Sequence, residues 1–263
     1  MRLFIELAKR SFQRQLTYRV ATFASLATNF FFGMLRVAVM IALYGTSLDV
    51  NGLSLEGAIT FTGLTQALIG FLSLFGWYDM MNSIYTGAVA SDLLKPMGYF
   101  NFWLAQDLGR ALAQLMLRGL PMMLAYAILI GITFPNNLGQ WSCLFVSLIL
   151  AWLISFAWRF LVNLSGFWTP DARAISRFGF VLLYFVTGFL MPLRFFPDWF
   201  VRICNFTPFP YMVNTVIEVY LGVLSGQQLI WNLAKQAIWA VILIYTCRVT
   251  MRAGLRRLVI QGG

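Results

Sequence analysis

The stretch MPLRFFPDWFVRICNFTPFP, residues 191–210, holds four of the eight prolines of the chain and lies between long apolar segments. Proline interrupts a helix, and an interrupted helix in hydrocarbon leaves backbone groups unsatisfied unless protein or water surrounds them. The apolar run YMVNTVIEVYLG follows at residues 211–222. Residues 191–226 are too apolar for a solvated loop and too few for two further crossings. They therefore predict a pair of short re-entrant or interfacial helices, broken at Pro197 and at Pro208 and Pro210.

Aromatic residues in this stretch suit the headgroup region of a membrane, where amphipathic rings gather. Four of them are expected at that depth, namely Trp199, Phe200, Phe206 and Phe209. The alternative is an apolar loop outside the membrane that serves only to connect two spans.

The whole chain has the composition of an integral membrane protein. Its 263 residues are 60% hydrophobic and 11% charged, with a mean hydropathy of +0.77. Soluble domains carry about 25% charged residues, and a soluble fold this apolar would lack the polar surface to cover itself. The net charge of +10 comes from basic residues beside apolar runs, as the positive-inside rule produces. The sequence therefore predicts a lipid bilayer as its surroundings and no nucleic-acid partner.

The residue types of common catalytic and metal sites are missing from the sequence. It contains no histidine, and its three cysteines, Cys143, Cys204 and Cys247, form no Cys-x-x-Cys pair. A zinc site is not expected, and histidine-based acid–base catalysis is excluded. An intramembrane enzyme would need convergent acidic or nucleophilic groups, whereas the nine acidic residues here are scattered. The sequence therefore predicts a protein that is not an enzyme and holds no metal.

Apolar segments of about 20 residues or more, enough to cross roughly 30 Å of hydrocarbon, follow a basic N-terminus. In residues 1–19, leucine and phenylalanine recur at helical spacing between lysines and arginines, which predicts an amphipathic helix on the cytoplasmic membrane face, the alternative being a polar tail. The fold class is an all-α integral membrane protein, a single domain over residues 1–263. Its six predicted spans are residues 20–44, 58–78, 108–132, 141–168, 171–190 and 229–249.

Lysine and arginine set the predicted orientation. They gather before the first span, between the second and third, around the junction of the fourth and fifth, and after the sixth. The segments GTSLDVNGLSLEG and TFPNNLGQ, on the other side, contain none. Both termini are therefore expected in the cytoplasm. Thr169, Pro170 and Asp171 form a helix start, which places the beginning of the fifth span on the cytoplasmic side.

Polar residues inside apolar spans are costly, so they are candidates for function. Four of them are interpreted as lining a translocation path or the interface between two copies: Arg36, Gln66, Gln114 and Arg118. The alternatives are that Arg36 extends toward the outer headgroups and that Arg118 forms a structural pair within the bundle. The small residues Gly63, Ala67 and Gly70 form a stripe that favours helix packing over a substrate groove.

The string TGFLMPLRFFPDWFVRICNFTPFPYMVNTVIEVYLG, residues 187–222, resembles the last extracellular segment of the ABC-2 type exporter permeases. That segment has a small residue followed by glycine, then spaced prolines with an aromatic pair, and a closing glycine. Thr187, Gly188 and Gly222 match its two ends. The resemblance implies an extracellular gate formed by Pro192, Pro197, Trp199, Phe200, Pro208 and Pro210.

A second segment, GAVASDLLKPMGYFNFWLAQDLGR at residues 87–110, is similar to the Leu-Leu-Arg/Lys-Pro segment of the six-span branch of that family. The resemblance implies a cytoplasmic coupling region at residues 91–105 that lies in a groove of an ATPase subunit. Ser91 is expected to cap a short helix and Asp92 to complement its dipole. Three aromatic residues are expected to be exposed. The coupling residues are Ser91, Asp92, Leu93, Leu94, Lys95, Pro96 and the exposed Tyr99, Phe100 and Phe102.

The chain contains no G-x-x-x-x-G-K-[ST] motif with which to hold ATP phosphates. The resemblance therefore implies that ATP and Mg bind to partner ABC ATPase subunits, and that this chain is a permease pairing with a second copy or a paralogue. It implies export across a bacterial plasma membrane, since the coupling loop typical of importers is missing. The alternative, a secondary transporter or channel, predicts acidic residues or helix breaks at mid-membrane, whereas the breaks here lie at the outer edge.

Overall fold

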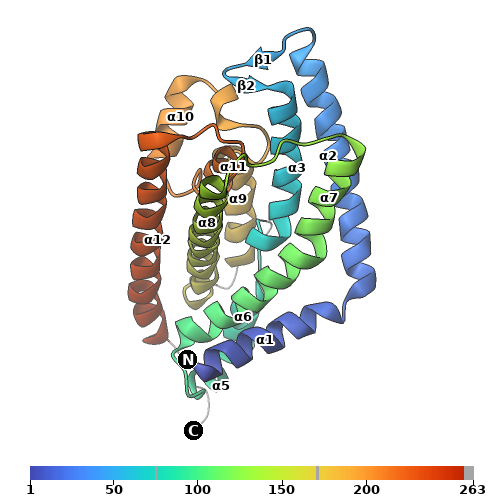
Figure 1. The fold of residues 1–263 in the computed structure, drawn as a ribbon. Coiled ribbons are helices and arrows are strands. Elements are labelled where there is room, and N and C mark those ends of the chain that lie inside the picture. The colour runs from blue at the N-terminus through green and yellow to red at the C-terminus, as the bar shows by residue number, and fades with distance from the viewer. Residues whose placement is uncertain (75, 170–171, 258–263) are drawn as a thin grey trace.

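The computed structural model describes residues 1–74, 76–169 and 172–257, and this part of the chain is helical apart from its loops and one two-stranded hairpin (Figure 1). Five helical segments of it are long and apolar enough to cross a membrane. Three of them are single helices: Val20–Tyr44 in α2 (Arg19–Tyr44), α3 (Leu55–Leu72) and α12 (Gly226–Leu255). The segment Tyr99–Leu129 consists of α6 (Tyr99–Gln114), a π-helical turn (Leu115–Gly119) and α7 (Leu120–Leu129). The segment Leu138–Phe167 consists of α8 (Leu138–Leu164) and the 3-10 turn Ser165–Phe167.

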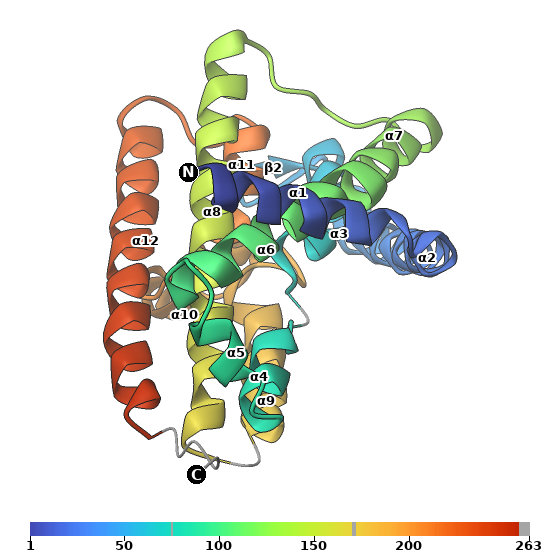
Figure 2. The same cartoon turned by 90° about the horizontal axis from the view of Figure 1, so that it is seen from below.

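Helix α3 is the most enclosed of these segments. Every residue from Gly57 to Ile69 is buried, and the helix contacts α2, α6, α7 and α8. The small-residue stripe makes these contacts possible: a Cβ at Gly63 would lie 2.9 Å from the ring of Tyr126, and one at Gly70 would lie 3.0 Å from the Gln114 amide. The packing interpretation of this stripe is confirmed. On the outside of the molecule, α2 and α12 lie on opposite flanks (Figures 1 and 2).

The fifth predicted span corresponds to α9 (Ala172–Val186), which has 15 residues. At 1.5 Å per residue it is about 22 Å long, less than the roughly 30 Å of hydrocarbon. The predicted helix start at Thr169 includes Pro170 and Asp171, which lie outside the described residues. The basic tail expected at the C-terminus also extends beyond them, from residue 258. Five of the six predicted spans therefore have spanning length in the described part of the chain.

At one end of the molecule, β1 (Asp49–Val50) and β2 (Leu53–Ser54) form a hairpin beside the proline-rich segment (Figure 1). Its turn residues Asn51 and Gly52 have φ of 52° and 74°, as a tight Asn-Gly hairpin turn requires. The proline-rich segment forms a 3-10 turn (Leu193–Phe195), α10 (Asp198–Asn205) and α11 (Asn214–Tyr220). Pro197 precedes α10, while Pro208 and Pro210 separate α10 from α11, so the predicted pair of short helices is confirmed.

At the other end, α1 (Arg2–Leu16) lies across α6, close to the short helices α4 (Asp79–Tyr85) and α5 (Val89–Leu93) (Figure 2). The crossing is close: a Cβ at Gly109 would lie 2.0 Å from the carbonyl oxygen of Ala8. The Ser11 hydroxyl donates to the carbonyl oxygen of Gln106 at 2.6 Å. The predicted N-terminal helix is therefore present, and one of its faces packs on protein.

Three predicted boundaries were wrong by six residues or more. The sixth span ends at Leu255, six residues after the predicted end. The second span ends at Leu72, six residues before the predicted end, because Ser73 adopts a left-handed conformation with φ of 48°. The third helix starts at Tyr99, nine residues before the predicted start, because helical structure resumes directly after Pro96, Met97 and Gly98. Residues 99–105, assigned from sequence to the coupling region, therefore belong to a long helix.

Candidate functional site

A charged cluster that the sequence did not predict joins α6 to α8. The Asp107 carboxylate is fully buried. It accepts two hydrogen bonds from Arg159, at 2.8 and 3.0 Å, and one from Arg110 Nε at 2.8 Å. The indole of Trp152 donates a fourth at 2.9 Å. Such paired, charge-assisted bonds fix geometry as well as adding stability.

The same cluster holds the end of α3. Arg110 donates from its two terminal nitrogens to the carbonyl oxygens of Gly70, at 2.8 Å, and Phe71, at 3.2 Å. Ser155 of α8 donates to the carbonyl oxygen of Leu72 at 2.6 Å. The last carbonyls of a helix lack partners within it and carry the negative end of its dipole. Because Asp107 neutralises only one of the two arginines, these carbonyls compensate part of the remaining positive charge, on Arg110. Asp107, Arg110 and Arg159, here called the buried triad, thus connect α3, α6 and α8.

From the sequence, Arg110 and Arg159 contributed only to the predicted orientation, as basic residues between the second and third spans and near the junction of the fourth and fifth. Asp107 was not predicted. One local signal was present: Asp107 and Arg110 are spaced i, i+3 on a helix that becomes apolar, which places them on one face. The third member could not be found from spacing, since Arg159 lies 52 residues from Asp107.

The predicted exposure of the aromatic coupling residues was wrong. Tyr99, Phe100 and Phe102 are 4%, 6% and 5% exposed. The Phe100 ring packs edge-on against Phe160 of α8 at a centroid distance of 5.1 Å. Because α6 has already begun at Tyr99, these side chains belong to the packed core. They therefore present no surface to a partner.

The cap expected at Ser91 was also wrong, whereas Asp92 does lie in the first turn of α5 (Val89–Leu93), where an acidic side chain complements the helix dipole. Helix α5 begins at Val89, so Ser91 lies inside it, and its hydroxyl donates back to the carbonyl oxygen of Ala88. Asp92 is buried and accepts from Ser83 at 2.7 Å and from Lys95. The Lys95 ammonium also lies 3.7 Å from the centre of the Phe102 ring. These contacts fix the loop internally.

What remains exposed in the predicted coupling region is mainly aliphatic. Leu94 is 86% exposed and Leu93 is 38% exposed, and Pro96 beside them is also exposed. Five residues after Leu94, α6 begins, and Asp107 lies eight residues further along that helix. Leu93, Leu94 and Pro96, here called the loop tip, are therefore connected to the buried triad through about 12 Å of continuous helix.

The structure brings together two of the four predicted intramembrane polar residues, Arg36 and Gln66. Arg36 Nη1 donates to the carbonyl oxygen of Phe189 at 3.1 Å. In the amide orientation that gives both the side-chain oxygen and nitrogen of Gln66 a partner, the oxygen accepts from Arg36 Nη1 at 3.1 Å. The nitrogen donates to the carbonyl oxygen of Asn29 at 3.3 Å. Asn29 lies two helical turns nearer the predicted cytoplasmic end of α2. Arg36 is thus hydrogen-bonded within the protein, to Phe189 and Gln66, and its extension toward the outer headgroups stays an untested alternative.

The other two residues lie elsewhere. Gln114 donates to Gln15 of α1 at 3.1 Å, and so joins the N-terminal helix to the core. Arg118 lies in the π-helical turn, and its Nε is buried without a hydrogen-bond partner among the described residues. No ion pair within the described part of the chain involves Arg118. The structural-pair alternative for Arg118 therefore has no support among the described residues.

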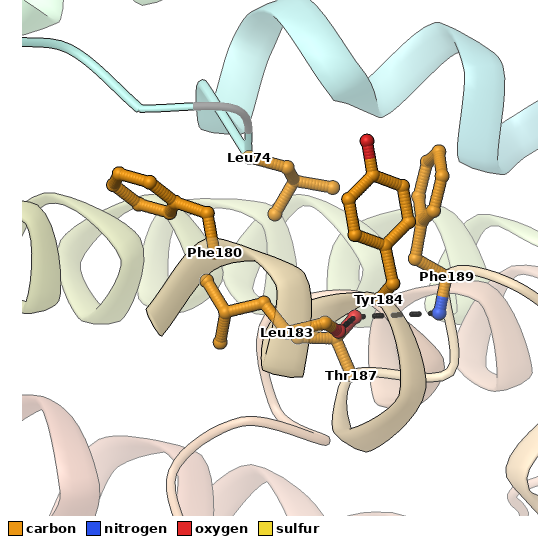
Figure 3. Close-up of a pocket in the computed structure, with 6 residues that line it drawn as sticks. All are labelled: Leu74, Phe180, Leu183, Tyr184, Thr187 and Phe189. Atoms are coloured by element: carbon orange, nitrogen blue, oxygen red, sulfur yellow. Dashed lines mark hydrogen bonds between the residues drawn. The ribbon is translucent and has the colours of Figure 1, made fainter. Parts of the chain in front are cut away.

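The predicted gate segment is held by hydrogen bonds at its base. After α9, the Thr187 carbonyl oxygen accepts from the Asn214 backbone amide at 3.0 Å, and the Asn214 side chain accepts from Leu193 N at 3.0 Å. Gly188 has a positive φ of 76°, and a Cβ added there would lie 2.9 Å from the side chain of Asn214. Thr187 also accepts from Phe189 N at 3.3 Å (Figure 3). This is where the chain turns out of α9.

Further along the segment, Arg194 connects it to the hairpin. Its guanidinium pairs with Glu218 of α11 at 3.0 Å and donates to the carbonyl oxygens of Asn51 and Gly52, both at 3.1 Å. Of the predicted gate aromatics, Trp199 is 61% exposed, whereas Phe200 stacks on Phe196. The hairpin, the 3-10 turn and α11 therefore form one connected cap.

The segment between α10 and α11 extends along α8 away from this cap. Phe209 packs edge-on against Trp158 at a centroid distance of 4.9 Å. Trp158 lies 20 residues from the start of α8 at Leu138, which is about 30 Å along the helix. A loop confined to the outer end of α8 would not make this contact, so the connecting-loop alternative is disfavoured.

Together these features define a multi-pass membrane protein whose loop tip and cap are linked to its spans by specific polar contacts. Residues 24–262 match the family model described as ABC-2 family transporter protein. The chain belongs to this family of ABC transporter membrane components, as the sequence resemblance predicted. A search of curated proteins finds no match to the chain.

Proposed function

We propose that this chain is the permease subunit of an ABC exporter, which moves a substrate outward across a bacterial plasma membrane on ATP hydrolysis by a separate ATPase subunit. The observation that carries the proposal is the connection from the exposed loop tip through α6 to the buried triad. Membership of the ABC-2 family transporter proteins and the lack of a phosphate-binding motif in the sequence support an ATPase on another chain.

The loop tip offers what a docking site for the ATPase requires. Exposed aliphatic side chains on a short, internally fixed loop lose little conformational freedom on binding. Lys95 and Asp92 fix the loop from within, so a push on Leu94 moves the start of α6. Because the triad bonds α6 to α8 and to the end of α3, these three helices would shift together.

The rest of the proposal uses the membrane orientation predicted from the lysine and arginine pattern. Helix α9 is the fifth of six spans, completed on the outer side by the proline-rich segment, and both termini lie in the cytoplasm. Helix α1 rests on the cytoplasmic membrane face as well as on α6. Two permeases, identical or paralogous, form the path between them, and the cap held by Arg194 opens to release the substrate outside.

The test is a pair of loop-tip substitutions, Leu93→Ser with Leu94→Ser, in the permease co-expressed with its ATPase. Loss of apolar anchors at an interface costs about 2 kcal/mol or more, roughly thirtyfold in affinity. We expect the ATPase to be lost from affinity-purified permease, or its hydrolysis to be uncoupled from transport. The matched control is Leu48→Ser, since Leu48 is also 86% exposed but lies next to the hairpin. Unchanged co-purification and coupling would place the ATPase elsewhere, first on α1.

A further inference from the structure

A cavity of about 280 Å³ opens between α2, α3 and the end of α9. Its volume lies just below the usual range of about 300–1,000 Å³ for small-molecule sites. The lining combines hydrogen-bonding groups with aromatic rings, and includes Asn29, Phe32, Arg36, Gln66, Tyr184 and Phe189. The last two also line the small hollow at the end of α9 (Figure 3).

Arg36 is the charged group of this cavity. No ion pair within the described residues involves it, and its guanidinium contacts neutral groups: two amide oxygens and the ring of Phe189, 4.3 Å from its Cζ. A guanidinium presents five donors in a planar fork, and only Nη1 is used in these hydrogen bonds. The remaining donors are therefore available to a ligand.

The surroundings make this charge effective. In apolar surroundings a charge acts over a longer range than in water, because little screens it. Uncompensated arginine is costly in a membrane span, and an anion in the cavity would remove that cost while using the idle donors. A cation would be repelled, which gives discrimination by charge.

We propose that this cavity binds the anionic group of an amphiphilic substrate, with Arg36 as its partner. The Gln66 amide orients the guanidinium, and the rings of Phe32 and Phe189 contact the apolar part beside the charge. This inference rests on the proposed function, because it names the class of substrate that the permease would carry.

The experiment measures binding to the permease alone, in nanodiscs of zwitterionic phosphatidylcholine, with three fluorescent probes on one C12 chain. The probes end in a carboxylate, a hydroxyl or a trimethylammonium group. We expect the carboxylate to bind at least about tenfold more tightly than the alcohol, as charge-assisted hydrogen bonds to a guanidinium allow. The ammonium should bind most weakly. Equal affinity of the three for the unmodified protein would overturn the proposal without requiring any variant.

Substitution then assigns the preference to a residue. Arg36→Gln should abolish the advantage of the carboxylate over the alcohol, and Arg36→Lys should keep part of it. The matched control is Arg202→Gln, because Arg202 is exposed on α10 and should leave the preference unchanged. A preference that survives Arg36→Gln would contradict the inference. No ATPase is present in this assay, so failure here leaves the loop-tip experiment standing, and the reverse also holds.

Discussion

Two arginine sites lie within helices of spanning length, and they differ in what faces the guanidinium. Arg159 is 1% exposed and makes a two-point contact with a buried carboxylate, in a cluster whose other arginine bonds helix-end carbonyls. Arg36 faces two neutral oxygens, a ring and a cavity. The first site has its counter-charge within the fold, whereas no ion pair with the second is found among the described residues. A buried charge with its partner supports structure, and one without it indicates a ligand.

The largest effect is expected at the carboxylate. Asp107→Asn would leave Arg110 and Arg159 buried without a counter-charge, and removing one partner of a buried pair costs about 3–5 kcal/mol. We expect a loss of folded protein or a large fall in melting temperature in detergent, measured by fluorescence-detected gel filtration over a temperature series. A variant as stable as the parent would show that the triad does not hold α3, α6 and α8 together.

A smaller effect is expected from the other side of the same pair. Arg159→Leu removes two hydrogen bonds but leaves Asp107 with Arg110 and Trp152, so the net charge of the cluster falls to zero. Hydrogen bonds to charged groups contribute about 1.5–3 kcal/mol, and we expect a loss of stability in that range. The double variant with Asp107→Asn should then cost less than the sum of the two. Additive costs would mean that the two residues act independently.

The smallest effect on stability is expected at the cavity. Arg36→Gln removes the hydrogen bonds to the Phe189 carbonyl and the Gln66 amide and a contact with a ring, each worth about 1 kcal/mol, and this loss is offset because the change also relieves an unpaired charge. We expect the melting temperature of the permease to stay close to that of the parent while transport falls. A destabilisation as large as that of Asp107→Asn would make Arg36 a structural residue and erase the contrast between the two sites.

The sequence predicted the fold where a local rule was sufficient. Apolar length predicted six spans, five of which have spanning length in the described residues. The spacing of Pro197, Pro208 and Pro210 predicted short helices, because proline acts on its own neighbours. The Lys/Arg pattern separated the segments at the hairpin end from those at the α1 end, although the membrane side of each end stays a prediction.

The site depended on contacts between segments, and there the sequence was less informative. Phe100 was predicted to be exposed because it follows a loop, but its ring packs against Phe156 and Phe160 of α8, more than 50 residues away. Arg36 and Gln66 were named separately, and only the structure places both at one cavity. Asp107 was missed because its importance comes from an arginine on another helix.

The crossing of α1 and α6 has a consequence for biogenesis. The hydrogen bond from Ser11 to Gln106 joins residues 95 positions apart, so α1 leaves the ribosome well before its docking surface exists. At synthesis rates of about 5–20 residues per second this interval lasts roughly 5–20 s. Gly109, where no Cβ fits beside Ala8, then lets α1 approach closely from the side once α6 has been made.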